Sequence, residues 1–240
     1  MELTKNAGPA STSPFNALFS MFYEPHRTFA ALEPRKAAWL SLVLLMLTTA
    51  SLAMWYFNMV DFEWLKDDMF GSIKEAAERD KMKTMMNKQT MQMGIVGGSL
   101  FILPLTMAVT GLYFMIAGKM LSKEFTFGSG FALSAWSSVP GLLLFPLGAM
   151  QILLSPNGQF SYGALNPLSL NQLVFQYGTG HPMAALLDTL NITTIWSMVL
   201  MVIGFQVWAK VAQSTAIKVV LIPYATIYGI WLAFAMNSAA

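Results

Sequence analysis

Residues 37–60 read AAWLSLVLLMLTTASLAMWYFNMV, a run of 24 residues without one charged side chain. About 20 apolar helical residues are enough to cross the hydrocarbon core of a bilayer. Several further runs of this kind follow, and a water-soluble fold of this size would have no way to hide them. The sequence therefore predicts an integral membrane protein.

Five uncharged stretches are long enough to span, at about residues 37–60, 93–117, 131–154, 190–209 and 219–236. In lipid, backbone amides must be paired within the segment or in a closed barrel, and continuous apolar runs favour helices because barrel strands alternate. The predicted fold class is all-α: a polytopic integral membrane helix bundle with five transmembrane helices. This domain is expected to occupy residues 37–240.

Composition excludes several classes of function. Only 11% of the 240 residues are charged, whereas a soluble domain carries about 25%. The net charge of +2 is too small for a nucleic-acid binder. The absence of cysteine removes disulfides, thiol catalysis and zinc–thiolate sites. His26 and His181 are predicted on opposite faces of the membrane, so they cannot share a metal or a triad. We expect no catalytic site and no cofactor.

Lysine and arginine in the connections predict the orientation. Eight lie on one side of the five spans and six on the other, the six all in the first connection, residues 61–92. Arg35 and Lys36 directly precede the first span, whose orientation usually dominates. The N-terminus is therefore predicted in the cytoplasm and the C-terminus outside.

The segment before the first span divides in two. Residues 1–13 are small and polar and are predicted to be disordered. Residues 14–36 carry apolar side chains at helical spacing, which predicts an amphipathic segment lying at the membrane interface. We expect its aromatic rings to anchor it against the membrane or the bundle. The residues predicted to contact membrane or partners are Phe22, Pro25, Arg27, Phe29, Arg35 and Lys36.

Methionines crowd the end of the first connection. Thioether sulfur is a soft ligand that suits Cu(I), so Met82, Met85 and Met86 are candidate metal ligands. The simpler interpretation is favoured: together with Met93 they fall on one face of a helix, where methionine packs as flexible filler.

Prolines inside the predicted spans free backbone carbonyls and kink helices, which neighbouring helices can accommodate and which also marks transport pathways. Asp188 is the only acid after Glu124, at the external edge of the fourth span. An acid buried at that depth would be a functional candidate, although at an edge it more often begins a helix. The candidate kink or pathway residues are Pro104, Pro140, Pro146, Asp188, Trp196 and Pro223. Gly94, Gly97 and Gly98 are candidates for close helix contact.

Three stretches together resemble the Yip-domain family, the Ypt/Rab-interacting membrane proteins, in its bacterial branch. They are Phe22–Leu32 with Pro25 and Phe29, Gly118-Lys119 followed by Phe131–Leu144 with Pro140, and Leu186–Pro223 with Asp188, Trp196 and Gly204. The resemblance covers about residues 15–236. It implies a five-span bundle with a cytoplasmic N-terminus, in a bacterial inner membrane.

Eukaryotic relatives in that family associate with Rab GTPases and act in vesicle traffic. Their Asp-Leu-Tyr-Gly-Pro signature is absent here, and the nearest fragment, Tyr162-Gly163, lies in a different connection. Rab binding is therefore not carried over to this chain.

Two functions remain open. A membrane scaffold would bind lipids or protein partners, among them a second copy of the chain, through the amphipathic segment. A small-solute permease or channel is the alternative, because the proline-kinked spans form two helical hairpins. The spans contain few polar residues and no charge, which favours the scaffold. The bilayer itself is the one partner that every interpretation requires.

Overall fold

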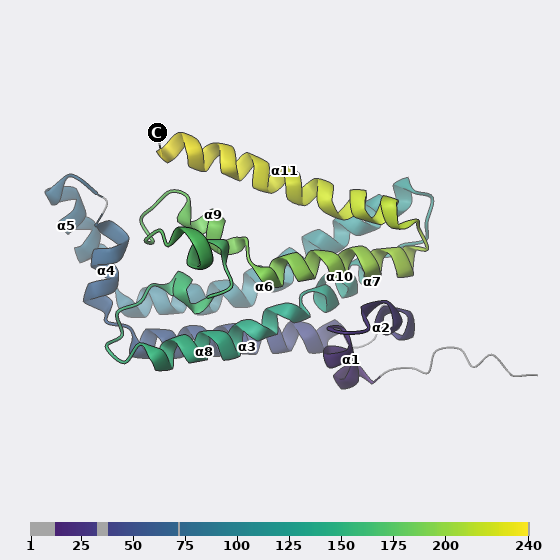
Figure 1. Ribbon diagram of the computed structural model, residues 1–240, viewed down its shortest axis with the longest axis horizontal. Coiled ribbons are helices and arrows are strands. Elements are labelled where there is room, and N and C mark those ends of the chain that lie inside the picture. The colour runs from purple at the N-terminus through teal and green to yellow at the C-terminus, as the bar shows by residue number, and fades with distance from the viewer. Residues whose placement is uncertain (1–12, 33–37, 72, 240) are drawn as a thin grey trace, which may run out of the picture. The chain divides into compact units, whose positions relative to one another are not determined.

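A computed structural model describes residues 13–32, 38–71 and 73–239. The described part is all-α and contains no β-strand, only one isolated bridge between Ser169 and Asn191. Figure 1 shows the elements coloured along the chain. The helices are α1 (Pro14–Ser20), α2 (Pro25–Ala31), α3 (Ala38–Met59), α4 (Phe62–Phe70), α5 (Ala76–Met85), α6 (Lys88–Met120), α7 (Phe127–Ser137), α8 (Leu144–Leu154), α9 (Ala184–Thr189), α10 (Ile192–Ala209) and α11 (Gln213–Ala239), with short turns η1 (Val139–Leu143), η2 (Tyr162–Leu165) and η3 (Asn171–Phe175).

Five helical stretches in this part of the chain are long and apolar enough to cross a membrane. They are Ala38–Met59, Lys88–Met120, Phe127–Leu154, Ile192–Ala209 and Gln213–Ser238. The predicted all-α, five-span fold class is confirmed, and the chain is a multi-pass integral membrane protein.

The helices extend beyond the apolar runs that predicted them. α6 has 33 residues because it begins in the polar stretch at Lys88, and α11 begins at Gln213, before the predicted start of the fifth span at 219. The third span is interrupted at Pro140, where the 3-10 turn η1 separates α7 from α8. Proline has no amide hydrogen to donate to the preceding turn, which explains a break at this position.

The chain divides into two compact units, each described here by itself. Unit 1 takes in Met1–Val43, Leu105–Val139 and Ser197–Leu221. Its core holds the rings of Phe114, Phe125 and Phe205. Phe205 meets Phe114 in a tilted arrangement and Phe125 edge to face, with centroids 5.2 Å apart in both pairs.

Within unit 1, α6 and α7 approach backbone to backbone. A Cβ added at Gly130 would lie 2.4 Å from the carbonyl oxygen of Gly111. Only glycine permits this approach. Gly94 and Gly97, by contrast, have no neighbouring atom within 4 Å of an added Cβ, so the prediction of close helix contact there is wrong.

Unit 2 takes in Leu44–Pro104, Pro140–Trp196 and Ile222–Ala240. Its buried core cluster contains Leu52, Tyr56, Phe57, Val60, Leu65, Ile152, Phe160 and Leu165. These residues come from α3, α4, α8 and the long connection after α8. The connection is therefore part of the core of this unit and not a free loop.

Candidate functional site

Unit 2 contains a cavity of about 370 Å³. Residues of α3, η1, α8, η2 and α9 line it, among them Thr48, Leu52, Phe145, Tyr162, Asn166 and Asp188. The walls are mostly apolar, with a few polar groups. Small-molecule sites commonly occupy about 300–1,000 Å³ and have this composition.

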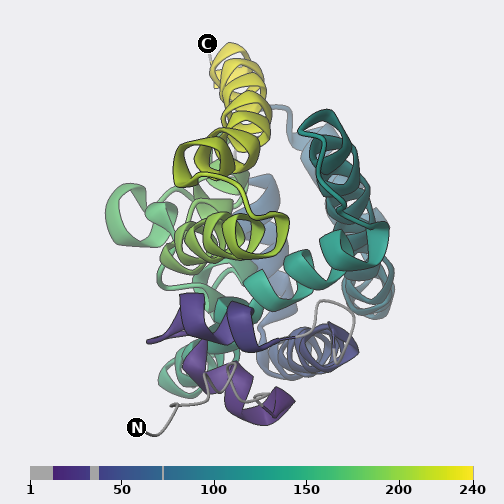
Figure 2. The same ribbon diagram turned by 90° about the vertical axis from the view of Figure 1, so that its right-hand side faces the viewer.

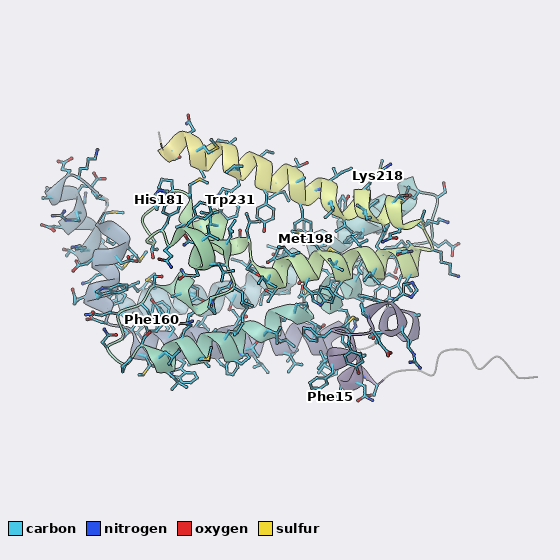
Figure 3. All side chains as sticks on the ribbon, viewed as in Figure 1. Phe15, Phe160, His181, Met198, Lys218 and Trp231 are labelled. Carbon is cyan, nitrogen blue, oxygen red and sulfur yellow. The ribbon has the colours of Figure 1, made fainter. Side chains whose placement is uncertain are left out.

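The connection after α8 forms one side of the cavity because its backbone is fastened to the end of α3. The Tyr56 hydroxyl donates to the carbonyl of Phe160 at 3.0 Å, and the two rings meet edge to face; Phe160 is labelled in Figure 3. The amide of Asp61 donates to the carbonyl of Gly158 at 2.9 Å.

Gly158 is required at this fastening. Its φ is +69°, and an added Cβ would lie 2.3 Å from the carbonyl oxygen of Met59.

Asp188 brings a carboxylate to the cavity from α9. Its Oδ1 accepts a hydrogen bond from the Ser169 hydroxyl at 3.3 Å, and an added Cβ at Gly163 would lie 2.7 Å from its Oδ2. Burial raises the pKa of Asp188 above its ordinary value, and hydrogen bonds from the side chains of Asn171 and Ser169 only partly oppose this. None of the ion pairs found in the described part of the chain includes Asp188.

Asn166 joins the connection to α9. Its Nδ2 donates to the backbone carbonyl of Asp188 at 3.4 Å. Its Oδ1 is fully buried and has no hydrogen-bond partner among the described residues. A buried acceptor without a donor costs about 1–3 kcal/mol.

The N-terminal segment is built on unit 1. Ser13 caps α1 by accepting from the amide of Asn16, and Pro25 is the first residue of α2. The hydroxyls of Thr28 and Ser20 join the two helices at 2.9 Å. The buried face of the segment consists of Ala17, Leu18, Met21, Thr28, Phe29 and Leu32.

Phe29 is the centre of this contact and is fully buried. Its ring meets Trp208 of α10 edge to face at 5.2 Å, and the Trp208 indole donates to the Phe29 carbonyl at 2.8 Å. A Cβ at Gly204 would lie 2.7 Å from the Phe29 ring, so glycine makes room for it. Figure 2 shows α1 and α2, in purple, beside the yellow-green end of α10.

The opposite face of the segment carries three exposed aromatic rings. Phe15 is 66% exposed, and Phe19 and Tyr23 are each 71% exposed; Phe15 is labelled in Figure 3. Arg27 is also exposed and pairs with Glu24 at 3.3 Å. Phe22 is half-buried. Arg35 and Lys36, also predicted to contact membrane or partners, lie outside the described residues.

The predicted proline sites lie elsewhere. Pro104 is inside α6, Pro223 inside α11, Pro140 in η1, and Pro146 is the third residue of α8. None of the four lines the cavity, and neither does Trp196, whose buried indole nitrogen has no partner among the described residues. Of the predicted kink or pathway residues, the structure brings only Asp188 to the cavity.

The methionine cluster does not form one helical face. α5 ends at Met85, and the backbone of Met86 is extended. Met93 lies on a different helix, α6, so the prediction that these methionines share one helical face is wrong. The described residues contain no group of three or more histidine, cysteine, aspartate or glutamate side chains that could hold a metal.

Several cavity residues escaped the sequence analysis. Gly163 and Asn166 were hidden in a long connection rich in Gly and Asn, where no spacing marks them. Thr48 and Thr49 could have been identified from the sequence, because two adjacent hydroxyl side chains at the centre of the first apolar run indicate a polar site within the span.

Comparison with known protein families matches residues 19–235 to a family model described as the Yip1 domain. No curated protein matches the chain. No solved structure matches it either.

Proposed function

Because the chain belongs to the Yip1-domain family, whose model spans residues 19–235, we propose that it is a non-enzymatic membrane scaffold. It binds lipids or partner proteins, including a second copy of itself, through the N-terminal segment 14–36. Membrane insertion follows from the five apolar helices.

The two-sided N-terminal segment carries this proposal. One face is fixed to unit 1 through Phe29, and the other presents Phe15, Phe19 and Tyr23. Burying one such side chain contributes about 1.5–3 kcal/mol. A rigid element with three exposed rings is therefore suited to bind an apolar surface, either the membrane interface or another protein.

The location belongs to the same proposal. We place the chain in the cytoplasmic membrane of a bacterium, within the bacterial branch of the family. Its N-terminus lies in the cytoplasm and its C-terminus outside. The basic residues that directly precede the first span in the sequence, Arg35 and Lys36, support this orientation, and we expect them to bind anionic head groups.

Photocrosslinking tests the scaffold. A benzoylphenylalanine placed at Phe19 in native membranes is expected to form adducts with a protein or a lipid, distinguished by mass. Ile222, exposed on α11, serves as the lipid-facing control, and buried Phe29 as the control that reacts within the chain. Adducts at Ile222 with none at Phe15, Phe19 or Tyr23 would contradict the proposal.

The cavity beside Asp188 favours a second candidate, a small-solute permease, because a lone acid in an apolar cavity is a usual feature of transport sites. Flux measurements in proteoliposomes separate the two. The scaffold predicts no flux above that of empty liposomes, and clear solute flux that is lost in Asp188→Asn would establish the permease.

A further inference from the structure

The cavity in unit 2 holds a carboxylate that has no cationic partner among the described residues. Asp188 accepts hydrogen bonds from the Ser169 hydroxyl at Oδ1 and from the side chain of Asn171, and no lysine, arginine or histidine is among the lining residues. Gly163, which lines the cavity, places no side chain over Oδ2. One anionic group at the cavity wall is therefore left without a counter-ion.

The remaining walls are apolar. Leu52, Leu144, Phe145 and Leu165 line the same cavity. The hydroxyl of Thr48, which also lines it, is engaged by the carbonyl of Leu44 at 2.8 Å within α3. The cavity therefore joins the carboxylate of α9 to hydrocarbon from α3 and α8. Such a surface fits a molecule with a polar, donating head and an apolar tail.

We propose that this cavity binds the primary ammonium group of an amphiphile, with Asp188 as both counter-ion and hydrogen-bond acceptor. An ethanolamine lipid head group and a long-chain amine share this chemistry. The inference goes beyond the proposed scaffold function and does not depend on it.

Other ligand classes fit less well. A calcium ion takes six to eight oxygen ligands, usually with several carboxylates, and Asp188 is the only carboxylate that lines the cavity. An anionic head group would be repelled by Asp188. A quaternary ammonium has no N–H and cannot donate a charge-assisted hydrogen bond to Asp188.

Native mass spectrometry of the full chain in detergent tests the proposal. Phosphatidylethanolamine and phosphatidylcholine with identical acyl chains differ only in the substitution of the ammonium. We expect the wild type to bind the ethanolamine lipid about tenfold or more tightly than the choline lipid, as the loss of charge-assisted hydrogen bonds predicts. Decylamine and decanol make the matching comparison for a free amine.

Two variants locate the site. Asp188→Asn keeps the shape of the side chain and removes the charge, so the preference for the ammonium should disappear. Gly163→Ala keeps the charge and crowds Oδ2, so it should weaken binding of the ammonium. This variant tests the site independently if Asp188→Asn fails to fold. Asp80→Asn, an exposed acid on α5, is the matched control and should retain the preference.

Each outcome is decisive. Asp188-dependent binding of the ethanolamine lipid supports the proposal with a lipid as the source of the ammonium. Asp188-dependent binding of decylamine alone supports it with a free amine. Equal binding of ethanolamine and choline lipids together with equal binding of decylamine and decanol, or a preference that survives in both cavity variants, overturns it.

Discussion

Phe29 is held in unit 1 by its ring and by its backbone, since the ring packs on Trp208 while the carbonyl accepts from the same indole. A single side chain therefore fixes where α2 lies against α10. Arg27 is exposed and Thr28 is buried, so the peptide bond between them reports whether this contact is formed.

Phe29→Ala is expected to undock α2. Truncating a buried phenylalanine costs about 3–5 kcal/mol, which raises the undocked population by about a hundredfold or more. Limited trypsin digestion should cleave after Arg27 faster by a comparable factor. Phe15→Ala removes an exposed ring and should change the rate little, because such substitutions stay within about 0.5 kcal/mol. Equal rates in the two variants would contradict the docking role.

The raised pKa of Asp188 gives a second prediction at this scale. The folded-state pKa of this carboxyl lies above its unfolded value of about 3.8. Its contribution to stability is therefore fully present when the pH is below the unfolded pKa. The stabilisation is lost as the pH rises through the folded pKa. In Asp188→Asn this fall should be absent, and thermal unfolding of the purified protein from about pH 4 to pH 7 measures it.

Asp61 is the control of opposite sign. Hydrogen bonds from the backbone amide of Trp64 and the side chain of Gln159 lower its pKa. Its contribution is therefore present above the unfolded pKa and is lost on acidification. Asp61→Asn should lower stability at neutral pH and leave the fall assigned to Asp188 in place. If the Asp188→Asn variant kept the pH profile of the wild type, burial of the Asp188 carboxyl would have no energetic effect.

At the scale of elements, glycine positions decide which helices touch. The sequence analysis favoured Gly94, Gly97 and Gly98 because they are clustered, yet the close contact forms between Gly111 and Gly130. Spacing along one helix cannot identify the partner helix. That information resides in the packing of residues far apart in the chain.

Gly130→Ala is expected to force α7 away from α6. Its Cβ would lie 2.4 Å from a backbone oxygen, and overpacking of this kind costs about 1–3 kcal/mol. In Gly94→Ala the added methyl group would point into open space. This variant should raise the free energy of unfolding by about 0.5–1 kcal/mol, because alanine has the higher helix propensity. Unfolding in mixed detergent micelles compares them, and the same sign for both would contradict the contact.

The lengths of α6 and α11 show why span boundaries were the least accurate prediction. A helix of 33 residues is about 50 Å long, well beyond the roughly 30 Å of hydrocarbon. Polar residues from Lys88 to Gln92 continue the helix outside that layer. Hydropathy marks where lipid begins, whereas backbone hydrogen bonding continues past it.

At the scale of the whole molecule, an odd number of spans places the two termini on opposite sides of the membrane. Alkaline phosphatase fused after Ala240 is expected to be active, since it requires export, and green fluorescent protein fused there should stay dark. Fusions before Met1 should give the reverse pattern. A fluorescent C-terminal fusion would overturn the orientation that the charge pattern predicts.

The five apolar helices were predictable because each is a property of contiguous residues. The site was predictable only at Asp188, which stands out as the single acid in a long stretch. Asn166 and Gly163 meet it through a connection fastened by Tyr56 and Phe160, 104 positions apart. No local pattern encodes such a contact.

The contact between the Phe29 carbonyl and the Trp208 indole joins residues 179 positions apart. A ribosome adds about 5–20 residues each second, so roughly 10–40 s separate the synthesis of the two. During that interval nascent α1 and α2 exist without the helix that covers their apolar side. The surface of the bilayer accepts such amphipathic helices, so we expect the newly made segment to rest there and to pack on α10 only after the fourth span has been synthesised.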